Sequence, residues 1–178
     1  MFSLEYIAGC IDCDGSISIS ISRNRYKSKT GGKTSPQFAF SINLRQVPQY
    51  KEFLLQVQST LGMGSIYDHA ATSSTATAMC SWQTTKQQET LDICKLLRPF
   101  LFIKQKEADL MIEALELWLN NLGERKGAGF SRPDWVKQRV IEISSQMNPS
   151  QQKESSRRNK DIRVSTLPDF GQQNSANA

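Results

Sequence analysis

Two segments near the start of the chain alternate strictly between apolar and polar residues. Residues 16–22 have the sequence SISISIS, and residues 37–45 have the sequence QFAFSINLR. A period of two predicts half-buried strands with the isoleucines, phenylalanines and Leu44 facing a core. The opposite face is small and polar. Turn residues fill the segment between the two runs, which predicts an antiparallel hairpin with one apolar and one polar face.

Apolar residues at helical spacing predict the other main elements. A first helix over residues 4–14 has Ser3 as its N-cap and ends at Gly15. Further helices are predicted over residues 48–61, 87–97, 104–122 and 132–147, and a second hairpin from residues 64–69 and 75–84. Two hairpins joined in one curved sheet, packed on helices beneath, make an α+β fold whose upper face is open and polar.

The composition changes after residue 148, where Ser, Gln, Asn and charged residues replace the apolar positions. Such a segment buries too little apolar surface to offset the entropy of ordering it. We therefore expect one domain over residues 1–148 and a polar, flexible tail over residues 149–178. The sequence has no apolar run of membrane-spanning length and no secretory signal pattern, so we expect a protein inside the cell or an organelle, without a membrane partner.

Charge is distributed unevenly along the chain. The formal net charge is +5, and residues 16–51 carry seven basic residues and no acidic one. A field of one sign over part of a fold suits a polyanion such as nucleic acid. The alternative is an exposed basic loop that only keeps the chain soluble.

The cysteines allow two interpretations. Cys10 and Cys13 form a C-x-x-C motif, while Cys80 and Cys94 are widely spaced and His69 is the single histidine. A zinc site would need a second ligand pair with similar spacing. We therefore expect buried free thiols in a reducing compartment rather than a zinc or redox site.

The end of the first helix carries the chemistry. The stretch EYIAGCIDCDGS is apolar and small, then presents Asp12 and Asp14 before Gly15. Two acids at a helix C-terminus are unfavourable with the helix dipole, which argues for a function, although an ordinary turn is the alternative. The stretch resembles the signature of the LAGLIDADG homing endonucleases, with six residues in register: Ala8, Gly9, Ile11, Asp12, Asp14 and Gly15.

The resemblance extends beyond the motif. The segment RPFLFIKQKEADL over residues 98–110 resembles the one that carries a basic active-site residue in algal organellar members. The predicted order of elements, α-β-β-α-β-β-α, matches the single-motif fold with its four-stranded antiparallel sheet. Because the chain has no second D-x-D-G, the resemblance implies a homodimer about a two-fold axis. The motif helices would meet there through Ala8, Gly9, Asp12 and Cys13, where Cys13 replaces the usual Ala or Gly.

The resemblance also implies metal-dependent cleavage of DNA. The metal, Mg²⁺ or Mn²⁺, would be held by Asp14 and the backbone carbonyl of Cys13, whereas Asp12 is more often structural in the family and caps a helix end. Gln46 would position water, Lys104 would stabilise charge near the scissile phosphate, and Lys51 stands where a relative has Arg. The alternatives are that Gln46 merely ends a strand and that Lys104 merely begins a helix.

The implied partner is a nearly palindromic DNA duplex of about 20 base pairs, contacted by the outward face of the sheet, the basic loop and the start of the tail. The expected DNA-contacting residues are Ser18, Ser20, Ser22, Arg23, Asn24, Arg25, Tyr26, Lys27, Lys29, Lys33, Gln37, Ala39, Ser41, Asn43, Arg45, Tyr67, His69, Thr77, Met79, Ser150, Gln151 and Lys153.

The leading hypothesis is a site-specific endonuclease that supports intron mobility in an organelle, with a chloroplast favoured over a mitochondrion. Two alternatives on the same scaffold remain open. One is a maturase that binds intron RNA, and the other is a DNA-binding protein without catalysis. The intact Asp14 favours the enzyme.

Overall fold

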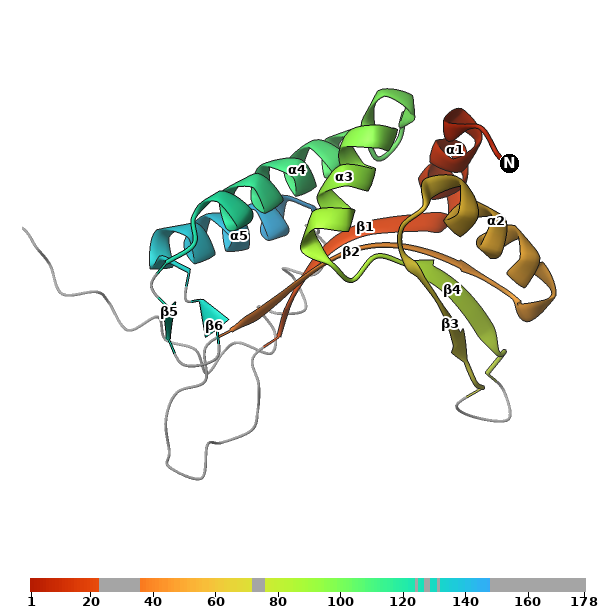
Figure 1. Cartoon of the computed structure of the whole chain (residues 1–178), viewed down its shortest axis with the longest axis horizontal. Coiled ribbons are helices and arrows are strands. Elements are labelled where there is room, and N and C mark those ends of the chain that lie inside the picture. The colour runs from red at the N-terminus through yellow and green to blue at the C-terminus, as the bar shows by residue number, and fades with distance from the viewer. Residues whose placement is uncertain (23–35, 72–75, 124, 127–128, 131, 148–178) are drawn as a thin grey trace, which may run out of the picture. The chain divides into compact units, whose positions relative to one another are not determined.

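The computed structural model describes residues 1–22, 36–71, 76–123, 125–126, 129–130 and 132–147 (Figure 1). Within these ranges five α-helices and a four-stranded antiparallel sheet form an α+β fold, which confirms the predicted fold class. None of the helices in this part of the chain has the length and apolar run that a membrane span requires. The tail from residue 149 lies outside the described residues, so the predicted domain boundary stays a prediction.

The first helix leads directly into the first strand. Helix α1 (Leu4–Asp14) begins where Ser3 Oγ accepts a hydrogen bond from Tyr6 N at 3.3 Å, as the capping pattern predicts. Strand β1 (Gly15–Ser22) follows without a loop. A Cβ added at Gly15 would stand 2.7 Å from Ile11 Cα, so this close approach of strand to helix requires a glycine.

Strand β1 pairs antiparallel with strand β2 (Gln37–Gln46), with Gly15 opposite Leu44 and Ser22 opposite Gln37. Ile17, Ile19 and the facing residues of β2 are buried, while the serines of β1 lie on the other face. The predicted alternation and hairpin are thereby confirmed.

The second hairpin is shorter than its sequence pattern suggests. It consists of strand β3 (Ser65–His69) and strand β4 (Met79–Gln83), so Thr77 precedes the strand in which it was predicted. Strand β4 also pairs with β2, and the order across the sheet is β1-β2-β4-β3. A separate two-stranded pair, which the sequence did not predict, joins β5 (Arg125–Lys126) to β6 (Gly129–Phe130).

The remaining helices differ from prediction mainly at their ends. A 3₁₀ turn, η1 (Pro48–Tyr50), replaces the first residues of the predicted second helix. A second 3₁₀ turn, η2 (Arg98–Phe100), follows helix α3 (Gln87–Leu97) and precedes the loop that leads to helix α4 (Gln105–Asn120). The helices and this turn are α2 (Lys51–Leu61), α3 (Gln87–Leu97), η2 (Arg98–Phe100), α4 (Gln105–Asn120) and α5 (Asp134–Met147).

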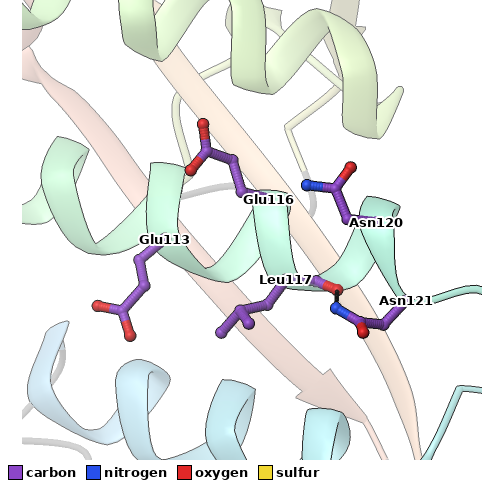
Figure 2. A pocket seen from close by; sticks show the side chains of 5 residues that line it. All are labelled: Glu113, Glu116, Leu117, Asn120 and Asn121. Atoms are coloured by element: carbon purple, nitrogen blue, oxygen red, sulfur yellow. Dashed lines mark hydrogen bonds between the residues drawn. The ribbon is translucent and has the colours of Figure 1, made fainter.

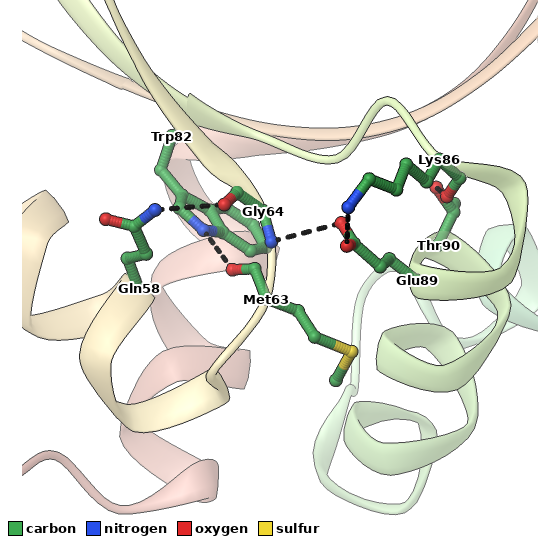
Figure 3. A network of polar contacts seen from close by, with 7 residues as sticks. All are labelled: Gln58, Met63, Gly64, Trp82, Lys86, Glu89 and Thr90. Atoms are coloured by element: carbon green, nitrogen blue, oxygen red, sulfur yellow. Dashed lines mark hydrogen bonds and ion pairs between the residues drawn. The ribbon is translucent and has the colours of Figure 1, made fainter.

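The hydrophobic core lies between the sheet and the helices, which pack on one of its faces (Figure 1). Trp82 of β4 is its largest fully buried side chain. The indole Nε1 donates to Met63 O at 3.0 Å, and Gln58 Nε2 donates to Gly64 O at 2.9 Å (Figure 3). These bonds fix the loop between α2 and β3 on the end of β4. Within the described residues, no helix packs on the opposite face of the sheet.

Candidate active site and nucleic-acid interface

Asp14 lies at the junction of α1 and β1 and is exposed. Its Oδ2 accepts a hydrogen bond of 3.3 Å from Nε2 of Gln46, the last residue of β2. Two predicted site residues, 32 positions apart in sequence, are therefore in contact. The register of the hairpin makes this contact, because Gly15, which follows Asp14, pairs with Leu44 near the end of β2.

Asp12 serves the start of α4. Its two carboxylate oxygens accept hydrogen bonds from the backbone N–H groups of Phe102 at 2.7 Å and Lys104 at 2.8 Å. Lys104 is the N-cap residue of α4, and its Nζ donates in turn to the backbone carbonyl of Asp12. Asp12 thus caps a helix end, and it brings Lys104 to the end of α1 that carries Asp14.

The charge of Asp12 is held by this environment. Burial by itself raises the pKa of the carboxyl. The backbone N–H donors of Phe102, Lys104 and Ile103, together with the charge of Lys104, lower the pKa by more than burial raises it. The net effect is a pKa below the ordinary value of 3.8. Asp12 is therefore ionised at neutral pH and is a buried hydrogen-bond acceptor. The exposed Asp14 is better placed to bind a ligand.

Lys51 stands apart from this group. It begins α2 and forms an ion pair of 2.6 Å with Asp68 of β3, with side chains 41% and 68% exposed. Asp68 is the register partner of Cys80, which is the partner of Gln46, so the ion pair lies two strands from the Asp14–Gln46 contact. That spacing is about 10 Å in a regular sheet.

The donors near Asp14 suit a hard divalent cation. Mg²⁺ prefers carboxylate and carbonyl oxygens and keeps several water ligands. Asp14 uses one oxygen for Gln46, and its Oδ1 has no partner within the described part of the chain. The carbonyl of Cys13 belongs to the last turn of α1, beyond Ile11, whose carbonyl accepts the N–H of Gly15 at the helix end. Because the described residues contain no cluster of three His, Cys, Asp or Glu, a metal here needs ligands from elsewhere.

The outward face of the sheet carries the predicted DNA-contacting residues that the structure describes. Ser18 lies opposite Ser41, with 3.3 Å between their hydroxyl oxygens, and Ser20 and Ser22 lie opposite Ala39 and Gln37. On the other hairpin His69 pairs with Met79 and Tyr67 with Ser81, which places Tyr67, His69 and Met79 on one face. Arg45 and Asn43 complete that face on β2.

Three further residues of this face were not predicted from the sequence. Ser16 and Asn43 continue through Gln83 to Ser65 in one row across all four strands, and Arg45 continues through Ser81 to Tyr67. The pairing of β4 with β2 and β3 places Ser65, Ser81 and Gln83 on this face. The one sequence signal that could have indicated Ser81 and Gln83 is strand alternation, since they lie two and four residues after Met79 and so share its face.

The predicted DNA-contacting residues of the basic loop and of the tail lie outside the described residues. These are Arg23, Asn24, Arg25, Tyr26, Lys27, Lys29, Lys33, Ser150, Gln151 and Lys153.

The predicted dimer residues fall into two groups. Gly9 and Cys13 are exposed on one face of α1, and a Cβ added at Gly9 would have no atom within 4 Å. Ala8 and Asp12, by contrast, are buried in the core of the chain itself, since the helix turns them toward α3 and α4. The prediction therefore narrows to the face of Gly9 and Cys13.

The thiols occupy separate environments. Cys80 and Cys94 are buried, Cys10 is half-buried and Cys13 is exposed, and all four are free. Burial raises the pKa of the Cys94 thiol to about 12, which makes it an unreactive core residue.

A shallow pocket of about 280 Å³ lies on α4 and is separate from this site (Figure 2). Its carboxylates are engaged, because Glu113 pairs with Arg139 and Glu116 with Lys95, each at 2.7 Å. None of the predicted site residues lines it. The candidate site is therefore the end of α1 and the open sheet face, not this pocket.

Comparison with known proteins agrees with the fold and the motif. The model of the family described as LAGLIDADG endonuclease matches residues 7–112. DNA endonuclease I-CreI of Chlamydomonas reinhardtii is 29% identical over 114 residues, which cover 64% of this chain and 62% of that protein. The match thus spans less than two thirds of the length of this relative.

Solved structures of low sequence identity share the fold. One is homing endonuclease I-CvuI in complex with its target in the presence of calcium, with a TM-score of 0.62, 20% identity and coverage of 82% of this chain and 80% of that one. Another is homing endonuclease I-TnaI, with a TM-score of 0.65, 16% identity and coverage of 91% of this chain and 99% of that one.

Proposed function

Because the chain belongs to the LAGLIDADG endonuclease family, we propose that it is a site-specific DNA endonuclease that hydrolyses one phosphodiester bond in each strand of a long, nearly palindromic duplex. The observation that carries this proposal is the group of Asp14, Gln46 and Lys104 at the end of α1, beside an open polar sheet face. Intron mobility in an organelle is the biological role that we propose with it.

Asp14 and the carbonyl of Cys13 are the groups in this chain that would hold Mg²⁺ or Mn²⁺. When bound, such an ion supplies Lewis-acid stabilisation of the developing charge and a more acidic water. Gln46 fixes one oxygen of Asp14 and leaves the other free, so its hydrogen bond orients the carboxylate. The amide of Gln46 would also hydrogen-bond a water molecule and direct it at a phosphate.

Lys104 is a cation held at the same end of α1 by its contacts with Asp12. Its Nζ is anchored on Asp12 O, and its backbone is anchored on the Asp12 carboxylate, so the ammonium is positioned before DNA arrives. A preorganised cation stabilises charge that develops in the transition state without reorganising at that moment. Lys51 would add a weaker contribution, because its ion pair with Asp68 must first give way to a phosphate.

The proposed enzyme is a homodimer. Cutting both strands of a palindromic site requires two equivalent sites related by a two-fold axis. The exposed face of Gly9 and Cys13 would allow close approach of a second α1. Beside the Asp12 cap, Phe102 is 91% and Ile103 is 66% exposed, and a second copy of this chain would bury them.

The duplex, of about 20 base pairs, would lie along the outward face of the sheet, since a two-stranded β-ribbon fits the DNA major groove. Structures of two proteins of similar fold, homing endonuclease I-CvuI in complex with its target and archaeal homing endonuclease I-Vdi141I in complex with DNA, support this placement. Serines, Arg45, Tyr67 and His69 would contact base edges directly or through water.

The experiment that tests the proposal compares the wild-type protein with Asp14→Asn on partly randomised palindromic duplexes in Mg²⁺, followed by sequencing of the cut ends. We expect the wild type to cut a two-fold symmetric site and the variant to bind it with at least a hundredfold lower cleavage rate. Asp92→Asn, an exposed aspartate of α3, is the matched control and keeps wild-type cleavage.

Selective binding without cleavage by the wild-type protein would contradict the enzyme and favour a DNA-binding protein. If the wild type selects no duplex at all, intron RNA becomes the ligand to test and the maturase hypothesis replaces the proposal.

A further inference from the structure

Asn43 and Gln83 form an amide pair on the outward face of the sheet. They are register partners in β2 and β4, and both are half-buried. Asn43 Nδ2 donates a hydrogen bond of 3.2 Å to Gln83 Oε1. On either side, the same row continues to Ser16 of β1 and Ser65 of β3, so the pair lies at the centre of the four strands.

The two residues differ in what they can offer to a base. Direct recognition of adenine by Asn requires both its amide nitrogen and its amide oxygen. Asn43 Nδ2 is engaged with Gln83, and Asn43 Oδ1 is buried with no hydrogen-bond partner in the described part of the chain. Asn43, which the sequence analysis expected to contact DNA, therefore cannot make this bidentate contact.

Gln83 can make that contact. Its Nε2 has no partner among the described residues, and its Oε1 has accepted one bond where a carbonyl oxygen has capacity for two. Adenine presents an acceptor, N7, beside a donor, the N6 amino group, and a Gln amide complements both. The bond from Asn43 fixes which end of the amide is the oxygen, so the amide is oriented before DNA binds.

Folding stability does not account for this pair. A buried carbonyl without a partner costs more than one neutral hydrogen bond returns, and two apolar side chains of similar shape would serve the sheet at least as well. The unpartnered oxygen of Asn43 is therefore a cost that the fold alone does not explain.

We propose that Gln83 is a specificity-determining residue that recognises adenine in the target, and that Asn43 is its positioning residue. The inference rests on the proposed function, because it requires a DNA duplex on the outward face. In a two-fold symmetric complex the two copies of Gln83 recognise adenines at two symmetry-related positions.

The test measures base preference at every position of the bound and cleaved duplexes from a randomised library. Gln83→Glu removes the donor for N7 and adds a second acceptor, which favours the amino group of cytosine. Gln56→Glu, at an exposed position of α2, makes the same chemical change on the helix side of the sheet and is the control. Asn43→Leu and the double variant complete a cycle.

We expect wild type and Gln56→Glu to select adenine at one symmetric pair of positions. Gln83→Glu should lose this preference by about tenfold or more and shift toward cytosine there, with the other positions unchanged. Asn43→Leu should weaken discrimination at the same positions, and it should have no further effect on base preference in the Gln83→Glu background.

An unchanged base profile in Gln83→Glu, or a loss spread evenly over all positions, would overturn the inference. A wild-type protein that selects no duplex would instead refute the proposed function, so the two failures are distinguishable. The Gln83→Glu result decides the assignment even if Asn43→Leu fails to fold.

Discussion

Two aspartates of one helix turn differ in environment more than their spacing suggests. Asp12 is 7% exposed and accepts two backbone N–H bonds from a segment ninety residues away. Asp14 is exposed and holds one side-chain contact, to Gln46. The helical rotation between them sends one carboxylate into the chain and leaves the other at the site.

The structural role of Asp12 predicts a specific pH dependence. Its pKa is lowered in the folded state, so the stability that it contributes is complete above its unfolded value of 3.8 and is lost as pH falls through the folded value. Asp12→Asn should lower the free energy of unfolding at neutral pH by about 2 kcal/mol, because an amide cannot accept both N–H bonds. Urea unfolding followed by circular dichroism, over a pH series, measures this difference.

The difference in the free energy of unfolding between wild type and Asp12→Asn should narrow below pH 3.8, since the Asp12 carboxyl of the wild type then begins to gain a proton, first in the unfolded chain. Asp92→Asn, at an exposed position of α3, should track the wild type throughout. A gap that stays constant in acid would show that the charge of Asp12 is not what the cap uses.

At the scale of elements, the turn after α2 depends on two glycines that differ in the space around them. Gly62 and Gly64 both have positive φ, at 66° and 84°. A Cβ at Gly62 would meet nothing within 4 Å, whereas a Cβ at Gly64 would overlap the indole of Trp82. That indole is fully buried and bonded to Met63 O, so it cannot move aside (Figure 3).

Gly62→Ala should therefore destabilise the fold by about 1 kcal/mol, the cost of the left-handed backbone. Gly64→Ala should cost about 3 kcal/mol, because overpacking against Trp82 adds to that cost. Denaturant unfolding monitored by tryptophan fluorescence measures both variants under the same conditions. Equal losses would mean that the loop relaxes away from the indole.

The periodicity of single elements was sufficient to predict them, and their mutual register was not. Alternation identified β1 and β2 because each buries one face, and the Ser3 cap located the start of α1. The pattern did not show that Pro48 begins a 3₁₀ turn or that β4 starts only at Met79. The start of β4 depends on its pairing with β3, which no local pattern encodes, whereas the 3₁₀ turn is closed locally by Tyr50 N donating to Val47 O.

The candidate site was predicted unevenly for the same reason. Asp14, Gln46 and Lys104 came from the family resemblance, and the structure brings them to one place. Gln83 was missed because its relevance depends on pairing between β2 and β4, two strands that are not consecutive. The ion pair of Lys51 with Asp68 likewise joins elements that the sequence gives no reason to connect.

At the scale of the whole molecule, the proposed dimer predicts a separation of assembly from folding. Gly9 has free space around it in one chain, so Gly9→Leu should leave the unfolding free energy within about 0.5 kcal/mol of wild type. The same side chain should keep two α1 helices apart, and the variant should sediment as a monomer at concentrations where the wild type is a dimer. Analytical ultracentrifugation measures the change.

Gln138→Leu, at an exposed position of α5, places the same apolar side chain on another surface and should remain dimeric. Cleavage of both strands should disappear with the dimer in Gly9→Leu. A Gly9→Leu protein that still sediments as a dimer would place the interface on another surface.

The two faces of β1 differ, since one packs into the core and the other is polar and mostly exposed, and this difference has an evolutionary consequence. Ile17 and Ile19 are held by the core, while Ser16 and Ser20 face away from it. Changes at the outward positions alter folding free energy by only about 0.5 kcal/mol, so selection for folding leaves them free to vary. Under the proposed function, such proteins can therefore change the DNA sequence that they recognise while Asp14, Gln46 and Lys104 stay constant and the core is left unaltered.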